Sequence, residues 1–159
     1  MPTAQLIANT LLGQDLTSEE CGLLAKIVTQ KNLVKGEILF DEGTTDETLY
    51  ILISGKLEVL KMVGPENSIS IDTLKQGAMT GELSFIDNVA HTMRLISKTE
   101  SHVLMLQKTA FEALVEQHPL LTYHVMRSIL RYSHQIQRKI NNKYLEMHRM
   151  VQNQYTATY

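Results

Sequence analysis

The residues best suited to binding chemistry lie in the stretch TGELSFIDNVAHTMR, residues 80–94. Gly81, Glu82 and Leu83 open a short apolar segment, and a strand-like segment follows it. Backbone N–H groups at the start of a short helix can face an anion, and glycine lets the backbone approach a ligand closely. Such a site also needs a positively charged side chain, and the basic residue at the corresponding position is His91. The stretch therefore predicts an anion-binding turn with a weak positive charge.

Catalysis is the less favoured interpretation of the same residues. Glu82 and His91 have the side chains of a general acid and a general base, but a binding site explains both positions. The six histidines show no HxxxH or other metal-ligand spacing, and a single cysteine offers no pair for a metal site. We therefore expect neither an enzyme nor a metal protein, and no cofactor other than a bound ligand.

The composition is that of a globular protein with one core. The chain has 159 residues, of which 43% are hydrophobic and 20% charged, and this length favours one domain over residues 1–159. The N-terminal segment lacks the basic and apolar regions of a secretory signal, and no run has the length of a membrane span. Because Cys21 has no disulfide partner within the chain, we expect a cytoplasmic protein. Because no run has the length of a membrane span, we expect no membrane partner.

A set of short strands must position the turn. Before them, residues 16–29 have a helical pattern in which Thr17 and Glu20 form a capping box. From residue 34 to residue 106 the apolar period shifts towards two, with breaks at glycine, proline, asparagine and aspartate. Such a pattern predicts a small antiparallel roll or barrel. The expected strands are 37–40, 49–53, 57–62, 68–74, 93–96 and 103–106.

A long helix forms the C-terminal part of the prediction. Thr109 is expected to cap a short helix over residues 110–116, and Pro119 fits the first turn of the long helix, which runs to about residue 151. One apolar stripe follows this helix at spacings of three and four residues. Its members are Ile129, Tyr132, Ile136, Ile140, Tyr144, Met147 and Val151.

A helix of about thirty residues is about 45 Å long, which is longer than a body of this size covers. The far half of the stripe therefore needs another surface, and a second copy of the chain is the simplest one. We expect a homodimer whose seam consists of the stripe residues from Ile129 to Met147. The alternative is packing on the chain's own roll, which we expect for Leu121, Val125 and Ile129.

The long helix is also basic. Residues 121–149 carry a net charge of +5, which leaves −7 for the rest of a chain whose total is −2. A basic helix on an acidic body is one signature of nucleic-acid binding, but a solvated helix face has the same composition. Few aromatic residues are interleaved with the basic ones, and no nucleic-acid recognition motif is present. We therefore expect a solvated helix face and no nucleic-acid partner.

The order of helix, roll, short helix and long helix resembles the cyclic nucleotide-binding domain family, in particular the effector domain of the catabolite activator protein. The resemblance covers about residues 11–141. It rests on Gly36-Glu37-x-Leu39-Phe40-x-Glu42-Gly43, on Leu49-Tyr50-x-Leu52-x-Ser54-Gly55-x-Leu57-x-Val59, on Gly77 and Gly81-Glu82-Leu83-Ser84-Phe85, and on Phe111 and Pro119.

This resemblance implies an α+β fold with an eight-stranded antiparallel β-roll, of the double-stranded β-helix or jelly-roll type. An N-terminal helix and the roll would occupy residues 11–107, and the short helix and the long dimerisation helix would occupy residues 108–151. The resemblance implies cyclic AMP or cyclic GMP as a possible ligand, and a weaker anion, which His91 and Thr92 would suit, is the alternative.

Within the resemblance, residues 80–94 correspond to the family's phosphate-binding cassette. Glu82 is then expected to accept a hydrogen bond from the ribose 2′-hydroxyl, Ser84 stands where a small residue is usual, and Leu83 is expected in the core. The expected ligand contacts of the cassette are Gly81, Glu82, Leu83, Ser84, His91 and Thr92.

The family places an arginine beside the phosphate, and the corresponding residue here is His91. A guanidinium binds a phosphate through two parallel hydrogen bonds and stays charged, whereas an imidazole gives one bond and is mostly neutral at physiological pH. The difference should cost about 1.5–3 kcal/mol, roughly ten- to a hundredfold in affinity. Arg94 would supply the charge if the strand entry is shifted, but its odd offset from His91 points it to the opposite face of a strand.

Further differences from the family pattern concern the residues expected over the nucleotide base and the segment expected after the long helix. Activator-type members place a small hydroxyl pair over the base, whereas the corresponding residues here are Ile136 and Gln137. Thr80 replaces the usual aromatic residue before Gly81. Those members also continue into a helix-turn-helix, which the sequence up to Tyr159 lacks, so we expect a stand-alone effector domain.

Together these features predict a non-enzymatic regulatory domain that senses a small ligand and signals as a homodimer to an unknown output protein. Its ligand pocket would be weakened or altered by the replacement of the phosphate arginine with His91. The alternative is an interaction module that no longer binds cyclic nucleotides and acts through its dimer or partner surface.

Overall fold

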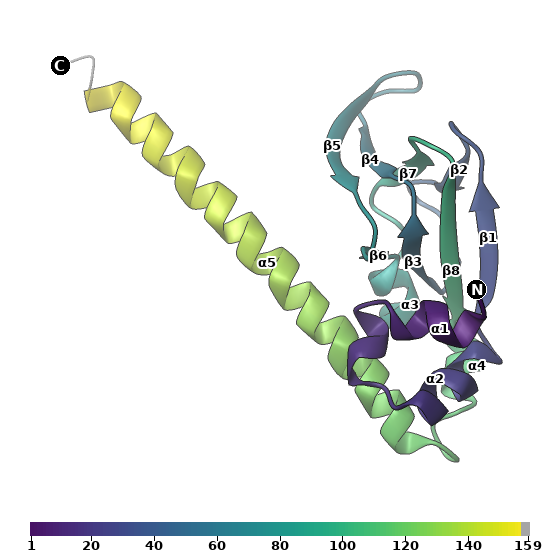
Figure 1. Ribbon diagram of the computed structural model, residues 1–159. Helices are drawn as coiled ribbons and strands as arrows, with labels where there is room; N and C mark the ends of the chain where they lie inside the picture. The colour runs from purple at the N-terminus through teal and green to yellow at the C-terminus, as the bar shows by residue number, and fades with distance from the viewer. Residues whose placement is uncertain (157–159) are drawn as a thin grey trace.

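The protein consists of a β-roll, a group of short helices at one end of the roll, and one long helix that leads away from it (Figure 1). The structure is a computed structural model and describes residues 1–156. The helices are α1 (Thr3–Ala8), the 3-10 helix η1 (Leu12–Asp15), α2 (Ser18–Ala25), α3 (Glu82–Asp87), α4 (Lys108–Glu112) and α5 (Pro119–Thr156). The strands are β1 (Thr29–Leu33), β2 (Ile38–Phe40), β3 (Thr48–Ser54), β4 (Leu57–Met62), β5 (Ser68–Leu74), β6 (Met79–Thr80), β7 (Arg94–Ser97) and β8 (Ser101–Gln107).

The strands form two four-stranded antiparallel sheets, with the orders β1-β8-β3-β6 and β2-β7-β4-β5. In the first sheet β3 pairs with β8, where Leu49 lies opposite Leu106 and Ile51 opposite Leu104. These side chains are fully buried because alternate residues of each strand face the space between the sheets. The predicted α+β fold, with an antiparallel roll, an N-terminal helical segment and a long C-terminal helix, is confirmed.

The first predicted helix is shorter than expected. Its capping box is present, since the Glu20 N–H donates to Thr17 Oγ1 at 3.1 Å and the Thr17 N–H donates to Glu20 Oε1 at 3.0 Å. The helix ends at Ala25, however, and Thr29 begins β1, a strand that the sequence pattern did not predict. In β1 only Leu33 is buried, so the strand lacks the apolar alternation that marks a half-buried strand.

The short helix before α5 also differs from the prediction. It begins at Lys108, and Gln107 at its N-cap makes no side-chain capping bond, so the predicted cap at Thr109 is wrong. It ends at Glu112 rather than at residue 116. Its Phe111 is nevertheless buried against Phe85 of α3, with ring centroids 5.4 Å apart, so the helix packs next to the cassette.

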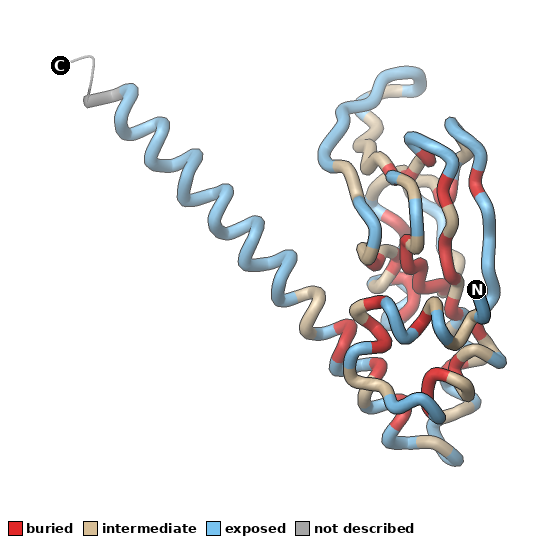
Figure 2. Tube along the Cα trace, in the orientation of Figure 1, coloured by how far each residue is buried: buried red, intermediate tan, exposed pale blue. Residues whose placement is uncertain are grey.

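The first turns of α5 belong to the core of the chain. Leu121, Val125 and Ile129 are at most 2% exposed, as expected for this half of the helix. Ile129 was also assigned to the dimer seam, and its burial in the chain's own core excludes that role in this structure. Beyond Tyr132 the helix leaves the roll, and Figure 2 shows its burial change from buried to exposed along its length.

Polar contacts fix the base of α5 against the N-terminal helices. Asp15 accepts hydrogen bonds from Arg131 Nη1 at 2.8 Å and from Ser128 Oγ at 3.2 Å. His124 Nδ1 lies 2.9 Å from Glu20 Oε2. Burial opposes ionisation of Glu20, but the Thr17 N–H and the His124 ring outweigh it, and the pKa of Glu20 is lowered. The α2 capping box and the base of α5 therefore share one carboxylate.

We predict that Glu20→Gln lowers the free energy of unfolding by about 1 kcal/mol near neutral pH, because glutamine keeps the capping box but loses the charged contact to His124. A carboxylate with a lowered folded-state pKa contributes stability above its ordinary value of 4.5, and this contribution is lost as the pH falls through the folded-state value. Urea unfolding at neutral and acidic pH should therefore show a difference that shrinks with acid. Glu19→Gln is the control, and a difference independent of pH would contradict the assignment.

Candidate functional site

The cassette begins at Gly81, whose backbone conformation only glycine adopts easily. Its φ is 83°, in the left-handed region, and it precedes the first residue of α3. A Cβ built on Gly81 would lie 2.6 Å from the carbonyl oxygen of Thr48 and 3.2 Å from the Tyr50 ring. The turn therefore lets α3 start directly against β3, which brings Glu82 to the edge of the roll's interior.

The two residues after Glu82 have different roles from those predicted. Leu83 is 53% exposed, so its predicted place in the core is wrong. Ser84 is 1% exposed, and its hydroxyl oxygen accepts hydrogen bonds from the backbone N–H groups of Glu47 at 3.0 Å and Asp46 at 3.3 Å. Ser84 thus ties α3 to the loop before β3, whereas Leu83 remains exposed.

His91, at the position of the family's arginine, is held by a carboxylate. Its Nε2 lies 3.0 Å from Asp46 Oδ1, and its side chain is only 4% exposed. Its ring stacks on Phe40, with centroids 3.7 Å apart and planes inclined by 16°. Backbone bonds to Thr44 and Gly43 fix the chain around it. The ring nitrogen that would donate to an anion is therefore engaged by Asp46.

Asp46 connects several elements at this point. Its carboxylate also accepts hydrogen bonds from the Tyr50 hydroxyl at 2.5 Å and from the Thr48 N–H at 3.2 Å. Burial and the Asp46 carboxylate raise the pKa of Tyr50, so the phenol remains a donor. Because the Asp46 N–H also donates to Ser84, one residue links β3, α3 and the segment that carries His91.

Arg94 does not replace the missing arginine in this structure. Its Nε and Nη2 each lie 2.9 Å from one oxygen of the Asp41 carboxylate, and this hydrogen bonding lowers the pKa of Asp41. The nearby Lys61 is paired with Glu42, and its ammonium donates to the Thr92 carbonyl at 3.1 Å. Both cations are therefore paired with carboxylates of the same chain. Because β7 begins only at Arg94, the strand alternation expected between His91 and Arg94 does not apply.

A cavity of about 400 Å³ lies between the roll, α3 and α5. All of the predicted cassette contacts line it, including Thr92. On the helix side Ile136 lines the cavity together with Tyr132 and Ile140, whereas Gln137 is absent from its lining, so only one of the two predicted base contacts faces it. Sequence reasoning missed Asp72 and Tyr132 as cavity residues, because strand and helix periodicity do not show which distant elements meet.

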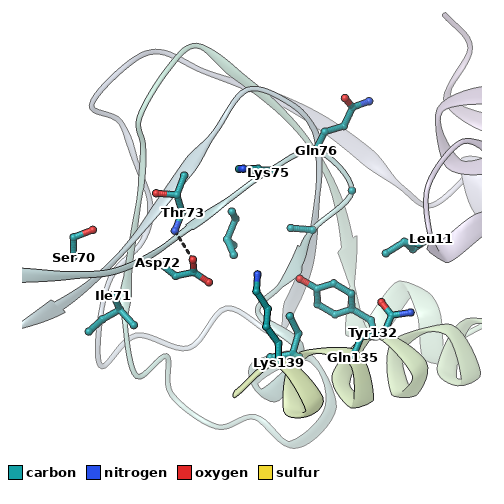
Figure 3. A pocket seen from close by; sticks show the side chains of 14 residues that line it. Leu11, Ser70, Ile71, Asp72, Thr73, Lys75, Gln76, Tyr132, Gln135 and Lys139 are labelled. Carbon is teal, nitrogen blue, oxygen red and sulfur yellow. Dashed lines mark hydrogen bonds between the residues drawn. The ribbon is translucent and has the colours of Figure 1, made fainter. Parts of the chain in front are cut away.

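A second, outer cleft of about 670 Å³ lies between β5 and α5 (Figure 3). Figure 3 shows Tyr132 and Lys139 reaching from α5 towards the side of Asp72, whose carboxylate accepts a hydrogen bond from the Thr73 N–H at 2.8 Å. Asp72, Leu74, Tyr132 and Ile136 border both the outer cleft and the inner cavity. The two spaces therefore meet along one side of the helix.

Comparison with known proteins identifies the class. The sequence profile of the cyclic nucleotide-binding domain matches residues 30–118, and the chain belongs to this family. It is 26% identical to the anaerobic regulatory protein of Bacillus subtilis over 128 residues, which are 80% of this chain and 54% of that protein. It is 25% identical to a CRP-like cAMP-activated global transcriptional regulator of Mycobacterium tuberculosis over 129 residues, 80% of this chain and 57% of that protein.

The structural comparison agrees on the fold. A crystal structure of a cyclic nucleotide-binding domain from Methylobacillus flagellatus has a TM-score of 0.79 at 20% sequence identity, over 91% of this chain and 81% of that chain. The chain spans about half the length of the two bacterial regulators. Within residues 1–156, none of the helices combines the length and apolar character needed to cross a membrane.

We predict that Gly81→Ala lowers the free energy of unfolding by about 1–3 kcal/mol, because an alanine at φ 83° is strained and its Cβ clashes with the Thr48 carbonyl. Chemical denaturation measures the difference. Gly64→Ala is the matched control, since no atom lies within 4 Å of its Cβ position. A Gly81→Ala protein as stable as the control would show that the turn does not need this conformation.

Proposed function

We propose that the chain is a non-enzymatic regulatory domain that senses a small ligand in the inner cavity and acts as a homodimer through α5. One observation carries this proposal: a single face of α5 both lines the cavity and continues as an exposed apolar stripe. Ile136 and Ile140 line the cavity, and Tyr144 and Met147 extend the same face beyond it. A ligand that contacts this face would have binding energy available to shift the helix.

Exposure along α5 supports the dimer. Ile140, Tyr144 and Met147 are 60%, 69% and 65% exposed, which is high for large apolar side chains in a row. Contiguous exposed apolar surface of this kind marks an interaction site. A second copy of α5 presents the same stripe, so a two-fold axis would bury both stripes against each other. The seam would then begin near Ile136, because the preceding stripe residues pack on the chain's own core.

The residues considered for acid–base chemistry fit a binding site. The acid–base pair considered from the sequence, Glu82 and His91, lines the same cavity, but the His91 ring nitrogen is engaged by Asp46. Among the described residues no cluster of histidine, cysteine, aspartate and glutamate has the arrangement of a metal site. Cys21 is buried and unpaired within this part of the chain, which agrees with a cytoplasmic location.

A second candidate function, an interaction module that no longer binds cyclic nucleotides, is favoured by one specific observation. The cations closest to the cassette, His91, Lys61 and Arg94, each contact a carboxylate of the same chain. A cyclic phosphate would then have to break one of these pairs before gaining a charged partner. Under this alternative the dimer or partner surface of α5 carries the function.

The dimer is tested by placing charges on the stripe. Wild-type protein should sediment at twice the 18.0 kDa chain mass, and Tyr144→Glu with Met147→Glu should shift it to the monomer mass, because four glutamates would meet at the two-fold seam. Asn142→Glu adds a charge on the opposite side of the helix and is the control. A monomeric wild type, or a double variant that remains dimeric, would contradict the seam.

The ligand position is tested by restoring the arginine. His91→Arg should raise the affinity for cyclic AMP about ten- to a hundredfold in calorimetric titrations, because the longer side chain reaches the cavity with a permanent charge. His134→Arg, on the exposed part of α5, is the control. Affinity unchanged by His91→Arg would mean that residue 91 does not face the phosphate.

A further inference from the structure

The inner cavity has an unusual set of charges for a site that accepts an anion. Its lining contains the carboxylates of Asp72 and Glu82, and neither lysine nor arginine occurs among the lining residues that the structure describes. His91 is the sole basic side chain in this lining, and it contacts Asp46. The ionised groups that face the cavity without a basic partner are therefore negative.

The cations outside the cavity do not change this balance. Lys61 is paired with Glu42, and Arg94 is held through two hydrogen bonds by Asp41. Lys75 and Lys139 line the outer cleft but not the inner cavity. A cyclic phosphate in the cavity would thus meet two carboxylates before it met a free cation.

The two carboxylates act on the same space. Burial, and in addition the charges of Glu82 and Asp72, raise the pKa of the Tyr132 hydroxyl, although a backbone hydrogen bond at Met79 opposes this. Asp72 comes from β5, Glu82 from the first turn of α3 and Tyr132 from α5, and all three line the cavity. Their convergence places negative charge at the point where a ligand would touch the helix.

The remaining surface of the cavity is mostly apolar. Its apolar lining consists of Phe40, Val59, Leu74, Met79, Leu83, Val89, Met93, Leu95, Ile136 and Ile140. A flat, largely apolar ring system fits such walls, and a hydroxyl or amino group on it would donate a charge-assisted hydrogen bond to a carboxylate. The chemistry of the lining therefore favours hydrogen-bond donors over negative charge.

We infer that this cavity selects an uncharged ligand of nucleoside size, with a flat apolar ring and hydroxyl or amino donors, and that Asp72 and Glu82 exclude cyclic phosphates. The inference rests on the proposed function, in which the cavity is a ligand site. Glu82 is half-buried and Asp72 is exposed, so water partly screens the charge of Asp72. A like charge close to a cyclic phosphate lowers its affinity, whereas a neutral donor gains a hydrogen bond to the same carboxylate. The two carboxylates would then select ligands by their charge, in addition to accepting a hydrogen bond from a ribose.

Adenosine and cyclic AMP are the matched probes, since they share the base and the ribose and differ in the cyclic phosphate. Calorimetric and NMR titrations at low ionic strength, where charge repulsion is least screened, compare their affinities. Adenosine should bind at least as tightly as cyclic AMP. Cyclic AMP binding about tenfold or more tightly than adenosine would overturn the inference, because the phosphate would then contribute favourably.

Variants separate charge from shape. Asp72→Asn should raise the affinity for cyclic AMP about threefold or more and leave that for adenosine unchanged, because only the anion is repelled. Glu66→Gln, in the turn between β4 and β5, removes an exposed carboxylate outside the cavity and is the matched control. An Asp72→Asn protein with unchanged cyclic AMP affinity would contradict the exclusion of anions.

The outcomes distinguish this inference from the proposed function. Tighter binding of cyclic AMP overturns the inference but supports the cavity as a ligand site. The absence of a response to either probe up to about 10 mM also overturns the inference. It would mean that the free energy of binding is weaker than about −3 kcal/mol. In that case the sedimentation of the α5 variants still decides the dimer, because it needs no ligand.

Discussion

The contact between Asp46 and His91 organises the side of the domain that carries residues 80–94. The Asp46 carboxylate receives the His91 ring and the Tyr50 hydroxyl, and its backbone N–H donates to Ser84. These bonds join the segment after α3, strand β3 and helix α3 itself. His91 and Ser84 are buried, whereas the Asp46 side chain is 29% exposed, so an unpaired His91 or Ser84 would be the costly loss. The charge of the site is thus fixed by a bond that also stabilises the fold.

The fold of the family is present around this contact. Gly81 still lets α3 begin against β3, and Glu82 still lines the cavity. The residue in the arginine position, however, stacks on Phe40 and donates to a carboxylate, so it serves the packing of the roll. On the opposite wall α5 supplies Ile136 and Ile140, and the same helix face leads to the exposed stripe.

Local patterns in the sequence were sufficient for much of the fold. The capping box at Thr17 and the start of α5 at Pro119 depend on neighbouring residues, and alternation revealed the strongly apolar strands. Strand β1 escaped prediction because its side chains are mostly exposed, and β6 because it has only two residues. Leu83 was assigned to the core from its position in the family pattern, whereas in the structure it is 53% exposed and lines the cavity.

The candidate site was predictable only in part. The cassette residues and Ile136 were found from their position in a family pattern, and all of them line the cavity. The partners that determine their charge were not found, since Asp46 is 45 residues from His91 and Asp41 is 53 residues from Arg94. No periodicity relates such pairs, because they are created by the closure of the roll. For the same reason the roles of Asp72 and Tyr132 emerged only from the packing of β5 and α5.

The central claim is that Asp46 holds His91 and keeps its ring from serving as the phosphate's cation. Imidazole ¹⁵N NMR spectra with and without cyclic AMP test it directly. The account predicts that His91 Nε2 carries the proton bonded to Asp46 and that its resonance does not move when cyclic AMP is added. A His91 resonance that shifts with saturation by cyclic AMP, together with loss of the Asp46 contact, would contradict the account.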